Sequence, residues 1–573
     1  MGIALALLFA LAPRFAVAQD TYQPMGAPVN PAVPAQWNRY HDYAEATALL
    51  EQLARAHPRL CRLESLGESY GGREMWVSII TDLDRGAESE KAGFWIDGGI
   101  HANELQGPEV VLYTAWFLLE SHGRNPVVAR LLAERVFYLL PMLSPDSRDA
   151  HMREPNTTHS PRSGQRPIDD DQDGQADEDG PNDLDGDGSI SQMRVRDPHG
   201  RWRPDREYPN LMREVGAEEV VGEYTLLGTE GIDDDGDGEV NEDGDGFYDP
   251  NRDWAWSWQP AYVQGGAYRY PFSIPENRMA ADFVMAHANI AGAQSYHNAG
   301  GMILRSPGVR GAQVPGPDLG VFDLIGRKGE AMLPGYRYMN VANDLYEVFG
   351  GEFDWFYSMQ GALTFTNELF TPFNYFRKPS EGFFGKQDDL HLFDRYLLFG
   401  EGIRPWKEYD HPQYGKVEIG GFVKQWTRQP PSFLLEEECH RNMAFTLYHA
   451  DQMPMVEVQS VEAKPLADGL TQVTAVVANR RLIPTRLAVD VQNRITPQDQ
   501  VVLTGEGLEV VAGLVSDTPW FDRAQEQKRR PHELRIDSIA GLRPVYVRWL
   551  VRGNGPYTVT ARSTKGGVHS LSR

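Results

Sequence analysis

Residues 94–104 read Phe94-Trp95-Ile96-Asp97-Gly98-Gly99-Ile100-His101-Ala102-Asn103-Glu104. The apolar run at the start of this stretch predicts a buried β-strand. A helix is predicted directly after it, over residues 108–120, because Pro108 is well placed in the first turn of a helix. The stretch therefore predicts a strand, a polar turn and a helix in succession, which is typical of α/β folds.

The same alternation continues along the chain. Further strands are predicted at residues 136–143, 291–297 and 363–368, and a further helix at residues 275–288. Together they predict an α/β domain over residues 37–454, with helices on both faces of a sheet. After residue 455 the pattern changes to short β-rich runs separated by turn residues, at 471–477, 485–491, 545–551 and 557–561. This region, 455–573, is predicted to be a C-terminal β-sandwich.

The composition excludes several classes of protein. The chain has 573 residues, of which 41% are hydrophobic and 24% are charged, and this is typical of globular proteins. Lys and Arg number 55 against 81 Asp and Glu, and a net charge of −26 should repel a nucleic-acid backbone. Only Cys61 and Cys439 are present, which leaves room for one disulfide at most. We expect a monomer that binds no nucleic acid.

An export signal is predicted at residues 1–18. An apolar run over residues 3–12 precedes the small-residue site Ala16-Val17-Ala18. The alternative is a buried N-terminal helix, and the run is too short to span a bilayer, which needs about 20 apolar residues. Residues 19–36 are rich in proline and alanine and predict an extended leader. No later segment has the length and apolarity of a membrane span, so we predict a secreted or periplasmic protein.

An acidic insertion is predicted at about residues 165–250. The spacings Asp183-x-Asp185-x-Asp187-Gly188 and Asp233-x-Asp235-x-Asp237-Gly238 copy the first half of an EF-hand loop. The twelfth positions hold Arg194 and Gly244 instead of a bidentate glutamate. Structural calcium bound by these six aspartates is favoured, because so many like charges repel one another without a cation. The alternative is a solvated acidic loop.

A candidate metal site begins at the end of the first strand. His101 and Glu104 are three residues apart in a polar turn, where an imidazole and a carboxylate can bind one metal ion. The same H-x-x-E spacing recurs at His151 and Glu154, among polar residues and before a proline. That second copy is predicted to be a surface loop.

Four further pieces follow in order. They are Pro250-Asn251-Arg252-Asp253-Trp254, Ser295-Tyr296-His297, a Tyr346 that precedes Gly350-Gly351 by four residues, and a strand that ends at Glu368. With H-x-x-E, this order resembles the zinc metallocarboxypeptidases of the carboxypeptidase A/B type, also called funnelins. The resemblance covers residues 37–450 apart from the acidic insertion. It implies a mixed, mostly parallel sheet flanked by helices.

The resemblance also implies roles for single residues. His101, Glu104 and His297 would bind one catalytic Zn²⁺, and Glu368 would be the general base. Asn251, Arg252 and Tyr346 would bind the terminal carboxylate of the substrate, and Phe353 would line the side-chain pocket. An arginine would stabilise the developing oxyanion, and Arg162 is preferred over Arg153 for this role.

The function implied is hydrolysis of the C-terminal peptide bond of peptides that have a free carboxylate. Two alternatives stay open. The same zinc site would also suit peptidoglycan stem peptides, and the acidic loops and the C-terminal region would suit a calcium-dependent binding protein with an inactive peptidase domain.

Overall fold

The structure is a computed structural model that describes residues 24–573, apart from 163, 170–173, 217, 219–220, 239, 242, 244–247, 380–381, 383–384 and 554. The predicted export signal at residues 1–18 lies outside the described residues, as does Gly244 of the second acidic loop. Among the helices of the described residues, none has the length and apolarity needed to cross a bilayer.

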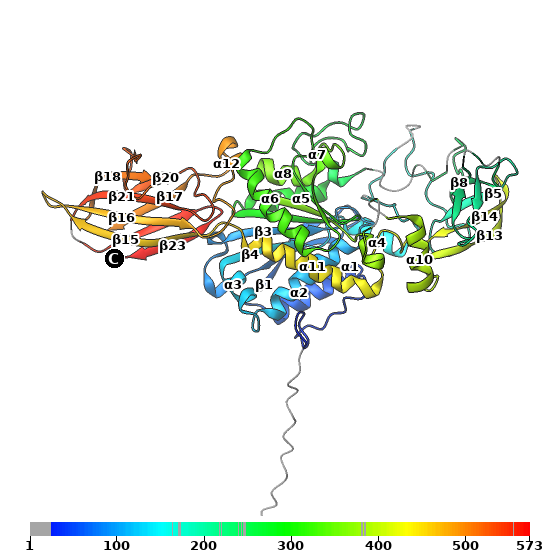
Figure 1. The fold of residues 1–573 in the computed structure, drawn as a ribbon, viewed down its shortest axis with the longest axis horizontal. Coiled ribbons are helices and arrows are strands. Elements are labelled where there is room, and N and C mark those ends of the chain that lie inside the picture. The colour runs from blue at the N-terminus through cyan, green and yellow to red at the C-terminus, as the bar shows by residue number, and fades with distance from the viewer. Residues whose placement is uncertain are drawn as a thin grey trace, which may run out of the picture.

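A mixed, mostly parallel sheet of eight strands occupies the centre of the molecule, in the order β1-β2-β4-β3-β9-β12-β10-β11 (Figure 1). Strand β3 is parallel to both β4 and β9, and β9 is parallel to β12. The predicted fold class is confirmed. The strands are β1 (Cys61–Glu68), β2 (Glu74–Ile80), β3 (Ala92–Gly98), β4 (Arg135–Leu140), β9 (Ile290–Asn298), β10 (Met302–Arg305), β11 (Arg337–Asn340) and β12 (Leu363–Leu369).

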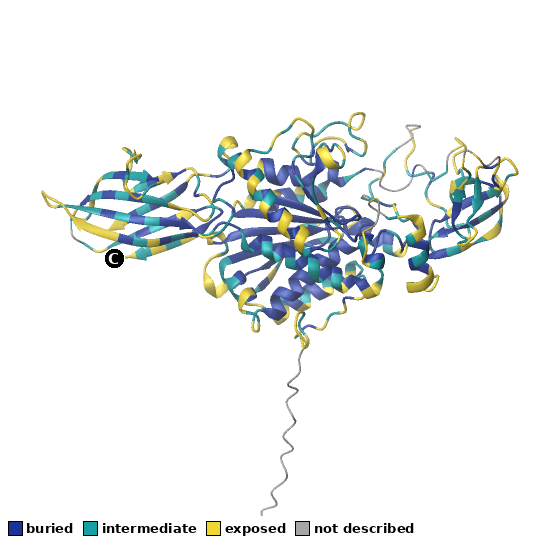
Figure 2. Cartoon of the chain, viewed as in Figure 1, coloured by how far each residue is buried: buried dark blue, intermediate teal, exposed yellow. Residues whose placement is uncertain are grey.

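Helices cover both faces of this sheet. Alternate side chains of β3 point to opposite faces, so each face is apolar and packs against its own set of helices. Phe94 and Ile96 join a core with α1 (Tyr43–Ala56), α2 (Gln106–Ser121), α3 (Pro126–Glu134), α6 (Gly316–Met332) and α11 (Ser432–Asp451). Trp95 joins the core on the other face, with α5 (Pro275–Ala286) and α8 (Glu352–Gln360). Figure 2 shows this central part as mostly buried. The remaining helices are α4 (Pro145–Arg153), α7 (Val341–Asp344), α9 (Phe373–Phe376), α10 (Gln387–Leu397), α12 (Ala488–Asn493), η1 (Leu83–Arg85), η2 (Glu88–Glu90) and η3 (Pro250–Arg252).

The acidic insertion forms part of a second sheet, at one end of the molecule (Figure 1). Its strands pair with β13 and β14, which come from much later in the chain, in the order β13-β14-β5-β8-β6-β7. The strands of the insertion, between the two acidic loops, are therefore held to the C-terminal half of the central domain. The strands are β5 (Gln192–Arg196), β6 (Trp202–Pro204), β7 (Met212–Glu214), β8 (Tyr224–Thr229), β13 (Ile403–His411) and β14 (Gly415–Phe422).

Two antiparallel sheets form the C-terminal region at the opposite end (Figure 1). Their orders are β15-β16-β21-β18-β19 and β20-β17-β22-β23, and Val477 and Trp549 of the first share one core with Val501 and Val559 of the second. The strands are β15 (Val456–Pro465), β16 (Leu470–Asn479), β17 (Asp499–Gly505), β18 (Glu509–Ser516), β19 (Gln525–Glu526), β20 (Glu533–Ile536), β21 (Pro544–Arg552), β22 (Tyr557–Ser563) and β23 (Gly567–Ser572).

One predicted β-rich run is wrong. Residues 485–491 contain the start of helix α12 instead of a strand. The side chain of Asp318 on α6 accepts hydrogen bonds from the backbone N–H groups of Ala488 and Val489 at 2.7 and 3.0 Å. A carboxylate from a distant helix thus satisfies the first turn of α12, and sequence periodicity does not reveal such a tertiary cap.

Two smaller expectations are also settled. Cys61 and Cys439 are both buried and form no disulfide.

The second H-x-x-E copy is not a surface loop, since His151 lies in α4 and is 2% exposed. Its Nδ1 lies 3.1 Å from the carbonyl oxygen of Ser160, and burial lowers its pKa to about 4. The chain after α4 folds back over this helix, which explains the burial of a polar segment.

Candidate metal centre and active site

His101, Glu104 and His297 converge in one buried cluster. The Nδ1 atom of His101 lies 3.0 Å from Oε1 of Glu104 and 3.1 Å from Nδ1 of His297. Nδ1 of His297 also lies 2.9 Å from Oε2 of Glu104. The cluster forms because β3 and β9 are parallel neighbours, so the turn that follows β3 and the end of β9 meet at one edge of the sheet.

The chemistry of these donors fits a zinc ion. One atom from each of the three side chains lies within 4.8 Å of the others, and two imidazole nitrogens with one carboxylate form a common catalytic zinc set. Burial by itself would raise the pKa of Glu104, but His101 and His297 hold it well below its usual range. Nε2 of His297 is buried and has no hydrogen-bond partner, and such an unsatisfied nitrogen beside Glu104 is consistent with a metal site.

A residue that the sequence analysis missed completes the arrangement around His101. The Nε2 atom of His101 lies 2.9 Å from Oδ1 of Asp249. Asp249 is the residue directly before the Pro250-Asn251-Arg252 segment, and its pKa is well below the usual range despite burial, because Arg252, His101 and Arg162 lie close to it. A carboxylate on the outer nitrogen of a ligand histidine fixes the ring orientation and tautomer.

Glu368 lies next to this cluster. In the register of β9 and β12, Glu368 stands directly beside His297. Burial and the neighbouring Glu104 raise the pKa of Glu368 to about 7, although His297 and Arg162 partly oppose the rise. The structure thus brings the predicted general base beside the predicted metal ligands.

Asn251 and Arg252 lie in the short helix η3, next to Asp249. The side-chain oxygen of Asn251 accepts a hydrogen bond from the backbone N–H of Glu352 at 2.9 Å, so the first turn of α8 positions it. Nη1 of Arg252 donates to the carbonyl oxygen of Asn251 at 2.7 Å and lies 3.6 Å from Oδ2 of Asp249. Tyr346 is 47% exposed as a whole residue. Partial burial of its hydroxyl raises the pKa of that group, while Arg252 opposes the rise and Glu368 adds to it.

Arg162 reaches the metal-ligand cluster and Arg153 does not. Nη1 of Arg162 lies 3.2 Å from Oε1 of Glu104, and Nε lies 3.5 Å from Oδ2 of Asp249. Arg153 is exposed at the end of α4 and pairs with Asp42 at 2.9 Å. The carbonyl oxygen of Arg162 accepts a hydrogen bond from Ala102 at 3.0 Å, which ties its loop to the H-x-x-E turn.

Phe353 packs in an apolar cluster and not among the polar side chains of the site. It belongs to the first turn of α8, is 5% exposed, and packs in an apolar cluster with Met302, Leu304, Val341 and Val348. Its ring also lies against Gly308. A role of Phe353 in substrate selection stays a prediction.

The six predicted calcium ligands divide into groups that differ from their sequence order. Asp183 and Asp185 lie together with Glu230, and Asp233 and Asp235 lie together with Asp179. Asp187 instead pairs with Arg404 at 2.9 Å, and Asp237 belongs to neither group. The sequence analysis missed both added residues, because Glu230 is far in sequence from Asp183 and Asp185, and Asp179 is far from Asp233 and Asp235.

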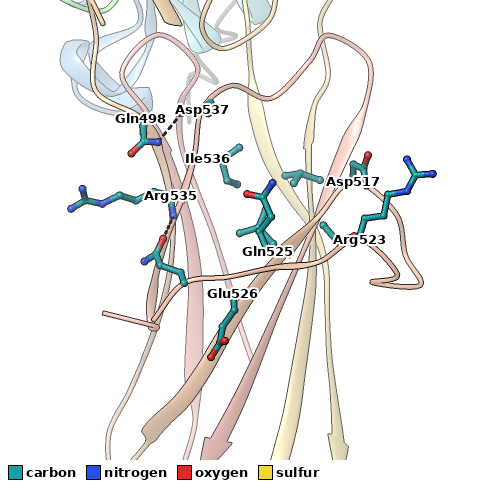
Figure 3. Close-up of a pocket in the computed structure, with 12 residues that line it drawn as sticks. Gln498, Asp517, Arg523, Gln525, Glu526, Arg535, Ile536 and Asp537 are labelled. Atoms are coloured by element: carbon teal, nitrogen blue, oxygen red, sulfur yellow. Dashed lines mark hydrogen bonds between the residues drawn. The ribbon is translucent and has the colours of Figure 1, made fainter. Parts of the chain in front are cut away.

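A separate cavity of about 540 Å³ lies in the C-terminal region (Figure 3). It lies between the end of β18 and the strands β19 and β20, and its lining includes Asp517, Arg523, Gln525, Arg535 and Asp537. No predicted site residue lines this cavity, so the candidate active site is confined to the central domain.

The sequence is similar to known zinc carboxypeptidases. Residues 46–169 and 239–392 match the model of a family described as zinc carboxypeptidase, Peptidase M14, and residues 455–572 match a domain of unknown function, DUF8731. Carboxypeptidase B of Astacus astacus is 36% identical over 110 residues, which are 19% of this chain and 34% of that protein. Carboxypeptidase D of Mus musculus is 33% identical over 111 residues, which are 19% of this chain and 8% of that protein.

The aligned stretches span only about a third or less of these curated relatives. Among solved structures, thrombin activatable fibrinolysis inhibitor aligns over 74% of this chain and 80% of that one, with a TM-score of 0.43 and 16% identity. The family match includes His101, Glu104 and His297, which the structure brings together. The central part of this chain therefore belongs to the zinc carboxypeptidase family, Peptidase M14, and retains its His-Glu-His metal site.

Proposed function

We propose that the protein is an exported zinc carboxypeptidase that removes C-terminal residues from peptides. The observation that carries this proposal is the position of Glu368 beside the three metal ligands, with Arg252 and Asn251 at the same site. A general base, a metal site and a carboxylate-binding arginine are the parts that such a reaction needs. Residues 1–18 support export through their signal-like pattern.

The chain's own residues account for the proton transfers. Glu368 is placed to take a proton from the attacking water and to pass it to the leaving amine. A pKa of about 7 suits both steps, because a group that titrates near the working pH can accept and donate. His101, Glu104 and His297 would hold the zinc ion, which would supply a Lewis acid for the carbonyl and for water.

Arg162 and Arg252 have separate tasks in this proposal. Arg162, beside Glu104 and Glu368, is placed to stabilise negative charge on the carbonyl oxygen. Arg252, with Asn251 and Tyr346, would bind the terminal carboxylate of the peptide, because guanidinium forms paired hydrogen bonds with carboxylates. The carboxylate contact restricts cleavage to the last bond.

The first test uses peptides that differ only in their C-terminal group. Peptides with a free carboxylate should be cleaved about 10- to 100-fold faster than their C-terminal amides, since a hydrogen bond to a charged group contributes about 1.5–3 kcal/mol. The measurement is mass-spectrometric profiling of a mixed peptide library, with and without a zinc chelator. The Arg252→Gln variant should lose this preference by cleaving the free acids slowly.

The matched control is Arg278→Gln, which removes an exposed arginine of α5 and should keep the preference. Equal cleavage of acids and amides by the parent protein would contradict an exopeptidase. Muropeptides tested alongside ordinary peptides distinguish the second candidate, cleavage of peptidoglycan stem peptides. Absence of any cleavage in the zinc-loaded protein would favour the third candidate, a binding protein.

We also propose that the acidic insertion binds structural calcium. Support comes from Glu230, which is fully buried with Asp183 and Asp185 close by, and whose pKa is raised to about 7 by burial and by those two charges. A divalent cation would relieve this repulsion, and carboxylate oxygens are the ligands that calcium prefers.

Calcium binding predicts a defined response to metal removal. Protein stripped with EDTA and given zinc alone should melt about 5 °C below protein given zinc and calcium, because ligand binding stabilises the folded state. A double variant, Asp183→Asn with Asp185→Asn, should lose this calcium effect. Full recovery of activity and melting temperature with zinc alone would rule out structural calcium.

A further inference from the structure

Arg428 joins the metal-ligand cluster from a part of the chain in which no motif was recognised. It lies in the segment between β14 and α11 and is 8% exposed. Its Nη1 donates to the carbonyl oxygen of Asn298 at 2.7 Å and lies 3.6 Å from Oε1 of Glu104. Its Nη2 donates to Nδ1 of His159 at 2.8 Å.

These contacts link three parts of the active site. Asn298 follows the metal ligand His297, Glu104 is itself a ligand, and His159 precedes Arg162 by three residues in the same loop. The next residue, Gln429, adds a fourth link, since its side-chain amide donates to the carbonyl oxygen of Asn103. Residues 428 and 429 therefore hold both the H-x-x-E turn and the loop of Arg162.

The hydrogen bond from Arg428 to His159 is one of several contacts that hold the loop of Arg162. Other side-chain contacts with the H-x-x-E turn come from Arg162, whose Nη1 lies 3.2 Å from Oε1 of Glu104, and from Asn103, whose Nδ2 donates to the carbonyl oxygens of His159 and Thr158 at 2.8 and 3.4 Å. Burial lowers the pKa of His159 to about 4, and Arg428 and Arg162 contribute to the fall. His159 is therefore neutral at neutral pH, and its Nδ1 can accept the hydrogen bond from Arg428.

The charge of Arg428 also matters for the metal ligands. Burial lowers the pKa of Arg428, Glu104 and Glu368 oppose this, and Arg162 adds to it. Two arginines thus face one ligand carboxylate, and each repels an incoming divalent cation. This repulsion opposes zinc binding, so the contacts of Arg428 point to a role other than support of the metal ligands.

We infer that Arg428 is a positioning residue of the active site, which fixes the His159 loop so that Arg162 faces the substrate carbonyl. The inference rests on the proposed carboxypeptidase function for its effect on turnover. Its effects on loop order and on zinc affinity do not depend on that function.

The test compares Arg428→Gln and Arg428→Lys with the parent protein. Arg428→Gln should lower kcat about 10- to 100-fold with little change in KM, since small displacements of a catalytic group have effects of this size. Arg428→Lys keeps the charge but cannot make both directed bonds, so its kcat should also stay low. Zinc affinity, measured by chelator competition, should be unchanged or up to about tenfold tighter in Arg428→Gln.

Limited trypsin digestion gives a readout that needs no activity. Cleavage after Arg162 should become about fivefold faster in Arg428→Gln, because the loop loses one of its side-chain anchors. The control Arg441→Gln removes a half-exposed arginine of α11 that pairs with Glu437, and it should change none of these quantities.

Three results separate the possibilities. Unchanged kcat and unchanged trypsin cleavage in Arg428→Gln would overturn the inference. Weaker zinc binding together with unchanged cleavage after Arg162 would also overturn it, because that pattern indicates support of Glu104 alone. A parent protein that cleaves no peptide would refute the proposed function, while the trypsin and zinc measurements would still decide the role of Arg428.

Discussion

Glu368→Gln should lower kcat by about 100- to 10,000-fold, the range typical of a lost general base. The substitution keeps the shape of the side chain but removes its ability to take a proton from water. Zinc content should stay the same, since Glu368 is not one of the three clustered ligands. Turnover is measured on a free-acid peptide, and metal content by elemental analysis of the same sample.

The stability of the zinc-free variant checks that the loss is chemical. Because the pKa of Glu368 is raised from 4.5 to about 7 in the folded state, its carboxyl costs stability that develops as pH rises between these values and is complete above pH 7, so Gln at this position should not lower the melting temperature at pH 8. The control Glu401→Gln changes an exposed glutamate and should retain full kcat. Retained turnover in Glu368→Gln would eliminate the mechanism.

Local patterns predicted the central fold and much of the site. The strand before His101, the strand before Glu368 and the helices between them follow apolar runs and turn residues that are visible in the sequence. The metal ligands could be predicted because each belongs to a short motif at or just after the end of a predicted strand. The ligand set itself followed from the resemblance to zinc carboxypeptidases, and the parallel pairing of β3 and β9 explains why these strand ends meet.

Tertiary contacts account for what the sequence analysis missed. Asp249 and Arg428 act through partners that are far away in the chain, and neither belongs to a spacing pattern. The helix α12 depends on Asp318 of α6, and the acidic insertion depends on pairing with β14. In each case the deciding partner is remote in sequence, and local propensity carries no record of it.

Glu104→Gln should weaken zinc binding by at least about 100-fold, because even the partners of ligand side chains contribute 10- to 100-fold. The carboxylate supplies the only negative charge among the three clustered ligands, and His101 and His297 keep it ionised. Gln has a similar size but a neutral oxygen, so the site loses charge without losing volume. Activity should vanish at limiting zinc and return only partly with excess zinc.

The chain contains its own matched control for this experiment. Glu154 is the second glutamate with H-x-x-E spacing, but it is exposed at the end of α4 and lies outside the three acidic and histidine clusters of the described residues. Glu154→Gln should leave zinc affinity and turnover unchanged. Equal effects of the two substitutions would show that H-x-x-E spacing alone does not identify the site. A large effect confined to Glu104 would assign zinc binding to the copy that β3 and β9 bring beside His297.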